Sequence, residues 1–323
     1  MFSLSTKLAA QLEGAQMGCF LIPGFHCMHP VSSCGLCLAS LFCALGTHGI
    51  DIASQKLALC PGLKHVGFEK FPNDDVASIS PVLSRTLCGL EKLVRLAIRT
   101  PIDGVALRHV VMLPQVAEHV LRIRNSQIED LSLLPSETPF SGTKDIALIG
   151  PDLGSMASLL RSEGQAFSGT EFCFEAPPTS QLTLSLLTSL ASPPRRSSLQ
   201  SITLDWEDSL TPDSKFRDNL YVISHDTLRP LAFFHSLREL SVDLINVTSL
   251  DDEELVDLAH GWPLLRFLRL VSWNGPQTKH LTLQGLISLV AICPKLERID
   301  LSLDVSAVPA SQLDWVCMFV VRL

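Results

Sequence analysis

A short pattern of apolar positions recurs along most of this chain. It consists of an aliphatic residue or Phe, then two other residues, a second apolar residue, one further residue and a third apolar residue. The six clearest copies are Leu63/Val66/Phe68, Leu93/Leu96/Ile98, Leu199/Ile202/Leu204, Leu237/Leu240/Val242, Leu265/Leu268/Leu270 and Leu296/Ile299/Leu301. Weaker copies are Ala117–Ile123, Thr143–Ile149 and Gly169–Glu175. Copies that begin near residues 63, 93, 117, 143, 169, 199, 237, 265 and 296 indicate an internal repeat.

Each repeat predicts a strand followed by a helix. The end of the pattern alternates between apolar and other positions, which is typical of a short strand with one buried face. Between these strands, apolar residues recur with helical spacing in Thr179–Pro194, Asp251–Pro263 and Thr282–Pro294. The acidic residues that open the second of these stretches suit a helix N-terminus, and its closing Gly and Pro end the helix. Strands and helices are therefore expected to alternate from about residue 50 onward.

The polar positions inside the strands decide between fold classes. Doubly wound sheets and (β/α)8 barrels also alternate strands with helices, but helices cover both faces of their sheets and their strands are almost continuously apolar. Here Arg269 separates Leu268 from Leu270, and Asp300 holds the same place in the last copy. The pattern predicts an α/β leucine-rich-repeat solenoid, with short parallel strands on a concave face and helices on a convex face.

Two regions are expected along the chain. Residues 51–323 form the repeat domain of about nine irregular units, and residues 1–50 form an apolar, Cys-rich segment. Within that segment, residues 17–46 carry no charged side chain apart from His26 and His29. The apolar run Val31–Gly46 is shorter than the ~20 residues of a transmembrane helix and does not resemble a signal peptide. We interpret residues 1–50 as a poorly ordered segment or an N-terminal cap, with membrane insertion or secretion as the less favoured alternatives.

The cysteines are predicted to be structural. His26, Cys27, His29, Cys34 and Cys37 include a C-x-x-C motif, but no second spaced ligand pair accompanies it, so no metal is expected. Cys60 and Cys293 each precede a Pro, in the place that Trp262 takes in its own repeat.

A position that accepts either Cys or Trp is defined by apolar packing rather than by thiol chemistry. The ten cysteines also lack the regular spacing of a disulfide framework, so we predict a reducing compartment, cytoplasmic or nuclear.

Neither enzymatic chemistry nor nucleic-acid binding is indicated. The chain contains no phosphate-binding loop, nucleophile elbow or H-E-x-x-H motif, so it is expected to be non-enzymatic and to use no cofactor. The net charge of −8 disfavours nucleic acid, which requires a concentrated basic face. The longest basic cluster, PPRRSS (Pro193–Ser198), is expected to be a solvent-exposed loop.

Candidate binding residues lie between the apolar positions, because alternate side chains of a strand point to opposite faces. The last four strands nominate Asp205, Glu239, Ser241, Asp243, Phe267, Arg269, Arg298 and Asp300, with Trp206 and Trp273 as aromatic anchors at the rim. The other outward positions are His65, Gly67, Arg95, Ala97, Ser201, Thr203 and Ser302. A curved repeat surface suits a protein partner better than a small metabolite.

The segments DDEELVDLAHGWP, WPLLRFLRL, HSLRELSVDL and CPKLERIDLSL resemble the C-terminal part of the F-box/leucine-rich-repeat-like proteins that are abundant in fungi. The resemblance extends over roughly residues 55–305 and is clearest from Ser198 onward. It implies an intracellular, non-enzymatic protein–protein interaction module that serves as the substrate-recognition part of an F-box-type ubiquitin ligase component.

The first sixty residues contain neither the Leu-Pro-x-Glu phrase nor the helices of an F-box, so binding to the ubiquitin-ligase adaptor is expected only if an F-box lies upstream. The alternative is a membrane-tethered or secreted leucine-rich-repeat binding protein anchored by residues 17–46. An α/β enzyme is a more remote alternative.

Overall fold

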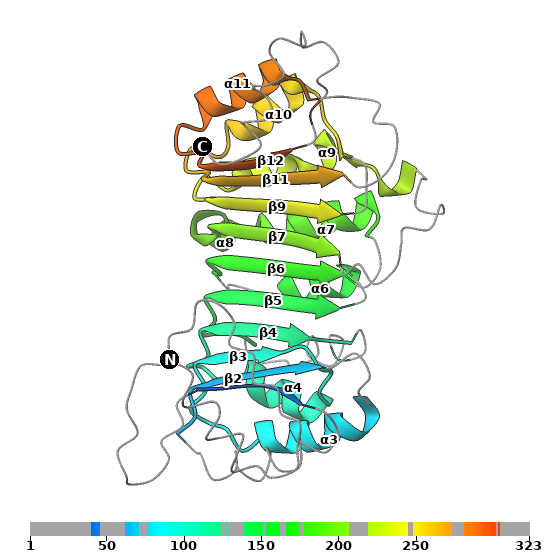
Figure 1. Ribbon diagram of the computed structural model, residues 1–323, viewed down its shortest axis with the longest axis vertical. Helices are drawn as coiled ribbons and strands as arrows, with labels where there is room; N and C mark the ends of the chain where they lie inside the picture. Colours follow the sequence, from blue (N-terminus) through cyan, green and yellow to red (C-terminus); the bar gives the residue numbers. More distant parts are fainter. Residues whose placement is uncertain are drawn as a thin grey trace, which may run out of the picture. The chain divides into compact units, whose positions relative to one another are not determined.

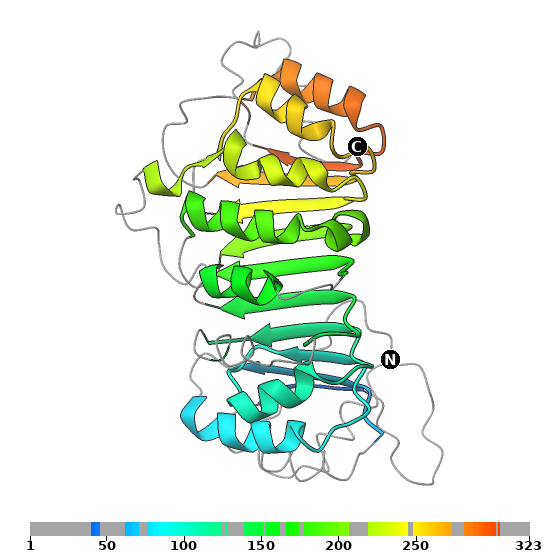
Figure 2. The ribbon, with the colours of Figure 1, turned by 180° about the vertical axis from the view of Figure 1, so that it is seen from behind.

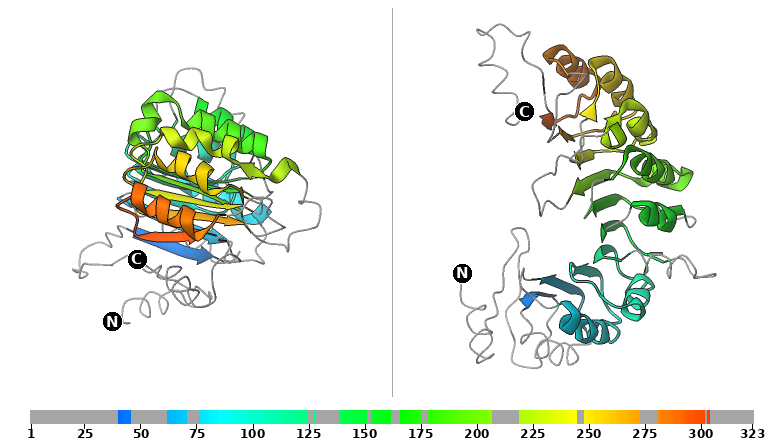
Figure 3. Two further views of the ribbon diagram at one scale, coloured as in Figure 1. Left: turned by 90° about the horizontal axis from the view of Figure 1, so that it is seen from above. Right: turned by 90° about the vertical axis from the view of Figure 1, so that its right-hand side faces the viewer.

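The computed structural model describes residues 40–45, 62–70, 76–124, 127, 139–150, 153–161, 166–174, 178–206, 219–244, 248–272, 281–301 and 303. The chain divides into two compact units, residues 1–143 and 144–323. In both units short strands alternate with helices, and the strands of each main sheet are parallel and follow the order of the chain. Seen edge-on in the right-hand view of Figure 3, each unit has one layer of strands and one layer of helices.

The first unit contains a parallel sheet in the order β1-β2-β3-β4. Its elements are β1 (Ser40–Leu45), β2 (His65–Lys70), α3 (Val76–Leu87), β3 (Arg95–Ile98), α4 (Gly104–Val111) and β4 (Glu118–Arg122). Helices α3 and α4 lie on one face of the sheet (Figure 1). Strand β1 comes from the predicted segment 1–50 and pairs with β2, with Ser40 opposite His65.

The second unit contains a parallel sheet in the order β5-β6-β7-β9-β11-β12 and a small parallel pair, β8 with β10. The strands are β5 (Asp145–Gly150), β6 (Gly169–Phe174), β7 (Ser201–Trp206), β8 (Ile223–Ser224), β9 (Glu239–Leu244), β10 (Thr248–Ser249), β11 (Phe267–Ser272) and β12 (Arg298–Leu301). The helices are α6 (Leu153–Arg161), α7 (Ser180–Leu190), α8 (Pro193–Ser198), η2 (Asn219–Tyr221), α9 (His225–Leu228), η3 (Arg229–Phe233), α10 (Asp252–Ala259) and α11 (Leu283–Ile292). Figure 2 shows α6, α7, α10 and α11 on one face of this sheet.

Every predicted copy of the repeat therefore contains a strand, and the predicted α/β architecture with parallel strands and helices on one face is confirmed. The apolar repeat positions form the core between strands and helices. Ile202, Leu240 and Leu268 occupy the same position in three successive copies and are each 0 % exposed. Because these side chains are aligned across neighbouring strands, they form a continuous apolar row under the sheet.

The predicted helices begin at side-chain caps. Thr179, Asp251 and Thr282 cap α7, α10 and α11 by accepting hydrogen bonds from backbone N–H groups of the first turn. At α10, Glu254 also accepts from the backbone N–H of Asp251, which completes a capping box. These caps explain why the acidic run at residues 251–254 opens a helix.

The start of α10 is also bonded to the start of α11. The Asp252 carboxylate accepts hydrogen bonds from the Thr282 backbone N–H at 2.8 Å and from its hydroxyl at 2.5 Å. Gly285 leaves the space for this carboxylate, because a Cβ at residue 285 would lie 2.1 Å from Asp252 Oδ1. One side chain thus connects the N-terminal turns of two consecutive repeats.

The weaker copies carry polar residues at core positions. The buried triplets are Val116/His119/Leu121 and Phe167/Thr170/Phe172, so the predicted starts at residues 117 and 169 are wrong. A sequence search for apolar residues skips His119 and Thr170, and it therefore places the copy one or two residues too late.

His119 is buried in the core of the first unit and is fully hydrogen-bonded there. Its side chain is 0 % exposed, with Nδ1 2.9 Å from Thr143 Oγ1 and Nε2 3.2 Å from Val110 O. Phe140 packs edge-on against the imidazole ring, with ring centroids 5.1 Å apart. Burial lowers the pKa of His119 to about 4, partly opposed by the hydrogen bond to Val110. The imidazole is therefore neutral at pH 7.

The basic cluster PPRRSS is not the solvent-exposed loop that the sequence predicted. It forms α8, and Arg195 is only 2 % exposed. Its Nη1 donates to Ser189 O at 3.0 Å, and its guanidinium lies over the Phe167 ring, 5.7 Å from the centroid. Arg196 lies over Phe233 at 4.6 Å. Backbone carbonyls and an aromatic face thus replace water around the buried Arg195, whereas Arg196 stays exposed while it contacts Phe233.

The Cys and Trp that precede Pro are buried, as the repeat pattern predicted. Trp262 and Cys293 are both 0 % exposed, and Trp262 Nε1 donates to Leu231 O at 2.8 Å. Cys293 Sγ lies 3.6 Å from Trp262 O, and burial raises the pKa of the thiol to about 11. A thiol that stays protonated at neutral pH is a poor nucleophile, which supports a packing role for Cys293. Cys60 lies outside the described residues.

Candidate interaction surface

The face of β7, β9, β11 and β12 that points away from the helices carries three rows of side chains. The strand register aligns Ser201, Glu239, Phe267 and Arg298 in the first row, Thr203, Ser241, Arg269 and Asp300 in the second, and Asp205 beside Asp243 in the third. We call these ten residues the outer strip. Neighbouring strands are about 4.8 Å apart, so side chains within one row are in reach of one another.

Arg269 is the centre of the charged part of the strip. Its Nη2 lies 2.5 Å from Asp243 Oδ2, and its Nε lies 3.3 Å from Asp300 Oδ2, so one guanidinium connects carboxylates on both flanking strands. The contact with Asp300 is an ion pair rather than a well-directed hydrogen bond. This arrangement fixes the orientation of the Arg269 side chain and leaves it about one third exposed.

Asp205 ends the row of acidic groups at β7. Its Oδ1 accepts a hydrogen bond from the Trp206 backbone N–H at 2.8 Å. Burial raises the pKa of Asp205, the neighbouring Asp243 raises it further, and the Trp206 N–H and Arg269 act in the opposite direction. Trp206 is half-buried beside it, and its Nε1 has no hydrogen-bond partner among the described residues.

The first row combines an aromatic ring with charges. The Arg298 guanidinium lies over the Phe267 ring, 3.9 Å from the centroid, in cation–π geometry. Glu239 is exposed on the opposite side of Phe267, whereas Ser241 in the second row is nearly buried between its neighbours. Trp273 and Ser302 lie outside the described residues.

The outward positions of the first unit form a separate, smaller row. His65 on β2, Arg95 on β3 and Glu118 on β4 are aligned by the strand register, and Arg95 forms an ion pair with Glu118. Burial and the Arg95 charge lower the pKa of His65, so this imidazole tends to stay neutral. Gly67 and Ala97 follow in the next row and add little side-chain surface.

The sequence analysis nominated no outward residue from the weaker copies on β4 and β6. Glu171 is aligned with Thr203, and Cys173 with Asp205, so both extend rows of the outer strip. On β4, Glu118 is aligned with Arg95 and Val120 with Ala97. These residues can be identified once a Thr or His is allowed at the middle position of the triplet. The residues that alternate with the triplet then point outward.

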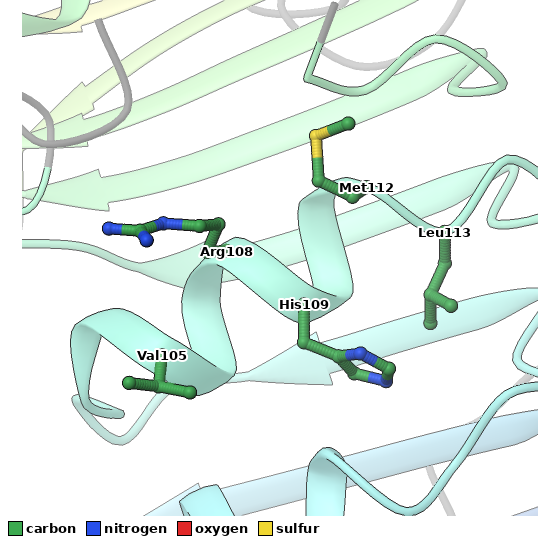
Figure 4. Close-up of a pocket in the computed structure, with 5 residues that line it drawn as sticks. All are labelled: Val105, Arg108, His109, Met112 and Leu113. Carbon is green, nitrogen blue, oxygen red and sulfur yellow. The ribbon is translucent and has the colours of Figure 1, made fainter. Parts of the chain in front are cut away.

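A surface hollow of about 360 Å³ lies on the helix side of the first unit, lined by Val105, Arg108, His109, Met112 and Leu113. Figure 4 shows these side chains spread around α4 and the turn that follows it, rather than converging on one point. A ligand site usually needs a few polar groups directed at a common centre. The hollow lacks that arrangement, and the outer strip remains the better candidate surface.

Neither a cluster of metal ligands nor a membrane-spanning helix occurs in the described part of the chain. Among the described residues, no three His, Cys, Asp or Glu side chains come together as a metal site. None of the described helices combines the length and the apolar character required to cross a bilayer. His26, Cys27, His29, Cys34 and Cys37, which the sequence did not favour as a metal site, lie outside the described residues.

No protein-family model matches the chain, and a search of curated proteins gives no significant match. The arrangement of side chains therefore has to carry the functional argument. The outer strip offers acidic and basic groups and an aromatic ring over four consecutive strands. The predicted rim anchor Trp206 is not part of it, because Trp206 alternates with Asp205 and follows Ile202 and Leu204 on the other face of β7, opposite Phe174. Such a surface can form hydrogen bonds, ion pairs and apolar contacts with another macromolecule.

Proposed function

We propose that the chain is a non-enzymatic protein–protein interaction module whose repeats form a leucine-rich-repeat solenoid. By its resemblance to F-box/leucine-rich-repeat-like proteins, the module would serve as the substrate-recognition part of a ubiquitin ligase component. The partner would be a protein bound on the outer strip, inside the cytoplasm or nucleus. Association with the ubiquitin-ligase adaptor would require an F-box upstream of the residues considered.

The strip itself is the observation that carries the proposal. Its side chains are borne by rigid strands whose other face is anchored in the core, as at Leu240 and Leu268. A preorganised surface loses little conformational entropy on binding, which favours affinity. Arg269 and Arg298 are already oriented by Asp243, Asp300 and Phe267, so their hydrogen-bonding groups need little rearrangement to meet a partner.

The chemistry of the strip favours a protein partner over a small metabolite. Its groups are spread over four strands, which is about 14 Å across three strand spacings. A small molecule needs a concave pocket that removes most of its surface from water. A protein segment can contact many dispersed groups at once, and solenoid repeats gain affinity in this way.

Affinity capture with a matched set of variants tests the proposal. The full chain is used as bait in a lysate of its source organism, beside Arg269→Glu on the strip and Gln284→Glu on the exposed side of α11. Arg269→Glu places a third carboxylate beside Asp243 and Asp300 and reverses the central charge. We expect at least one captured protein to be lost with Arg269→Glu and retained with Gln284→Glu. If every captured protein is retained by Arg269→Glu, the strip is not the binding surface.

The ubiquitin-ligase part of the proposal has its own test. A strip-dependent partner should become longer-lived in cells that lack this chain, and its half-life should be restored by the wild-type chain but not by Arg269→Glu. An unchanged half-life would leave a binding module without a role in degradation, and that result would refute this part of the proposal alone.

A further inference from the structure

The outward positions of the described strands β5, β6, β7 and β9 carry acidic but no basic residues. These strands are neighbours in the sheet (Figure 1), and their register continues the rows of the outer strip. The carboxylates at these positions are Asp145, Glu171, Asp205, Glu239 and Asp243. We call these five residues the acidic patch. No outward position of the four strands holds Lys, Arg or His, and the basic residues begin only with Arg269 on β11.

Small side chains occupy the middle of the acidic patch, along β7. The outward residues Ser201 and Thr203 are aligned with Gly169 on β6 and Ser241 on β9, respectively. The Asp145 carboxylate extends over Gly169, because a Cβ at residue 169 would lie 2.7 Å from Asp145 Oδ1. Glycine and short hydroxyl side chains therefore lie between carboxylates that project from the strands on either side. A partner chain can approach the sheet most closely along β7.

Arg269 shows how this sheet face holds a cation. Its guanidinium lies between carboxylates of the two flanking strands, β9 and β12. Thr203 occupies the same row two strands away, on β7. Glu171 lies beside Thr203 on β6, and Asp205 lies two residues further along β7. The surroundings of Thr203 are thus as acidic as those of Arg269, but a short hydroxyl side chain stands in place of the guanidinium.

The pKa of Asp205 indicates an excess of negative charge at this place. Burial raises this pKa, and the neighbouring Asp243 raises it further. The Trp206 N–H and Arg269 act in the opposite direction, but the effect of Arg269 is smaller than that of Asp243. The two carboxylates therefore repel each other more than the single guanidinium compensates. A cation from a partner placed beside Asp205 relieves this repulsion.

We propose that the partner protein binds through a basic segment that lies along β7, with an arginine or lysine side chain over Thr203, between Glu171 and Asp205. This inference rests on the proposed function and adds the chemistry of the partner. Glu171 is one strand spacing, about 5 Å, from Thr203, and Asp205 is about 7 Å away along the strand. Both carboxylates are therefore within reach of one cationic side chain, which can also donate to the Thr203 hydroxyl.

A second copy of this chain fits the acidic patch less well. The chain has a net charge of −8, and its longest basic cluster contains Arg195, which is 2 % exposed and hydrogen-bonded within the fold. A two-fold interface built on this face would bring two acidic patches together. Their mutual repulsion disfavours that arrangement, whereas a basic segment of another protein is complementary in charge.

Binding of synthetic peptide pools to the full chain tests the charge of the partner. Three pools of random peptides have equal length and differ only in charge: one is rich in Lys and Arg, one is neutral, and one is rich in Asp and Glu. At physiological salt we expect the basic pool to bind about tenfold more tightly than the neutral pool, because ion pairs with the patch add affinity. A preference for the neutral or the acidic pool would overturn the proposal.

A matched pair of double variants separates the acidic patch from the net charge of the chain. Glu171→Gln/Glu239→Gln removes two exposed carboxylates on either side of β7, and Glu91→Gln/Glu253→Gln removes two exposed carboxylates outside the patch. Affinity for the basic pool should fall about fivefold in the first variant and stay unchanged in the second. Equal losses would show non-specific attraction to an acidic protein, and the proposal would be wrong.

Substitution of Thr203 tests the position of the cation. Thr203→Arg supplies a guanidinium from the chain itself, in the place proposed for the side chain of the partner. It should weaken binding of the basic pool by about tenfold, whereas Thr203→Gln, which adds length without charge, should weaken it by at most about twofold. Equal losses in the two variants would mean that bulk rather than charge matters at this position, and the proposed placement would be refuted.

Failure of this inference can be told apart from failure of the proposed function. A protein captured from lysate in an Arg269-dependent manner, together with no preference for basic peptides, would leave the interaction module standing and refute only the charge of its partner. A dimer in sedimentation that Thr203→Arg dissociates would identify a second copy of the chain as the occupant and would also overturn the proposal.

Discussion

The same position of the repeat is aliphatic in one region and polar in another. In β9 and β11 it holds Leu240 and Leu268, which are buried among other aliphatic side chains. In β4 it holds His119, which is equally buried but bonded to Thr143 and Val110. An aliphatic residue at this position needs only apolar neighbours of complementary shape, whereas a histidine needs hydrogen-bond partners for both ring nitrogens. The repeat therefore tolerates a polar residue where neighbouring residues supply these hydrogen bonds.

The most severe test places a charge in the aliphatic row. Leu268→Asp should destabilise the second unit by more than about 4 kcal/mol, because it buries a carboxylate in a row of buried aliphatic side chains such as Leu240. The free energy of unfolding from urea titration measures the loss. A small loss would mean that the aliphatic row is less tightly closed than the buried fractions indicate.

A lower pH should destabilise the region around His119 but not the aliphatic row at Leu240 and Leu268. The pKa of His119 is about 4 in the folded chain, whereas the ordinary value for a histidine exposed to water is 6.5. Between these values the unfolded chain binds a proton and the folded chain does not, so stability falls as pH is lowered from about 6.5 to 4 and is fully present above 6.5. The limit is about 3 kcal/mol, from 1.36 kcal/mol per pKa unit.

The double variant His119→Leu/Thr143→Val isolates this effect. It removes the titrating ring together with the hydroxyl bonded to it. The loss of unfolding free energy between about pH 6.5 and pH 4 should therefore be smaller by up to about 3 kcal/mol. Urea titrations of both proteins at pH 7 and pH 4.5 provide the comparison. An unchanged pH dependence would show that His119 does not titrate as a buried group.

The hydrogen bond between His119 and Thr143 should give a measurable coupling energy between the two side chains. His119→Leu alone leaves the Thr143 hydroxyl without its histidine partner, and Thr143→Val alone leaves Nδ1 unpaired. In a double-mutant cycle at pH 7 we expect a coupling of about 1 kcal/mol, the usual net value of one buried hydrogen bond. A coupling near zero would mean that each side chain finds another partner, such as Val116 O for the Thr143 hydroxyl at 3.4 Å.

The smallest effect is expected on the outward side of the aliphatic row. Arg269→Gln removes the ion pairs with Asp243 and Asp300 but no core contact, so it should cost about 0.5–1 kcal/mol. The loss should shrink in 0.5 M salt because the pair is partly exposed. A loss as large as that of Leu268→Asp would show that the strip is part of the folding core rather than a surface free to bind.

Periodicity alone predicts those parts of the fold where one type of residue fills one type of position. The strands at Leu240, Leu268 and Ile299 follow from apolar alternation, and the helix starts at Asp251 and Thr282 follow from capping residues. His119 and Thr170 break the alternation because hydrogen bonds and packing with residues far away in sequence make them acceptable in the core. Strand β1 was missed for a similar reason, since its pairing with β2 depends on a partner 25 positions later.

The pairing of charged residues also could not be predicted from the sequence pattern. Arg195 could not be predicted as buried, because its partners Ser189 and Phe167 are brought to it only by folding. On the outer strip, alternation identified which residues face outward, but not that Arg269 would connect two carboxylates on different strands. Sequence reasoning thus identifies the surface and its residue types, and the structure adds the pairing that orients them.

The Asp252 carboxylate has a consequence for how the second unit unfolds. Because it bonds the first turn of α11 while it belongs to the first turn of α10, neither helix start can open without breaking a bond that the other one uses. Adjacent repeats of an array unfold separately when the interface between them is weak and together when it is strong. This single side chain strengthens one such interface, so α10 and α11 are expected to open together.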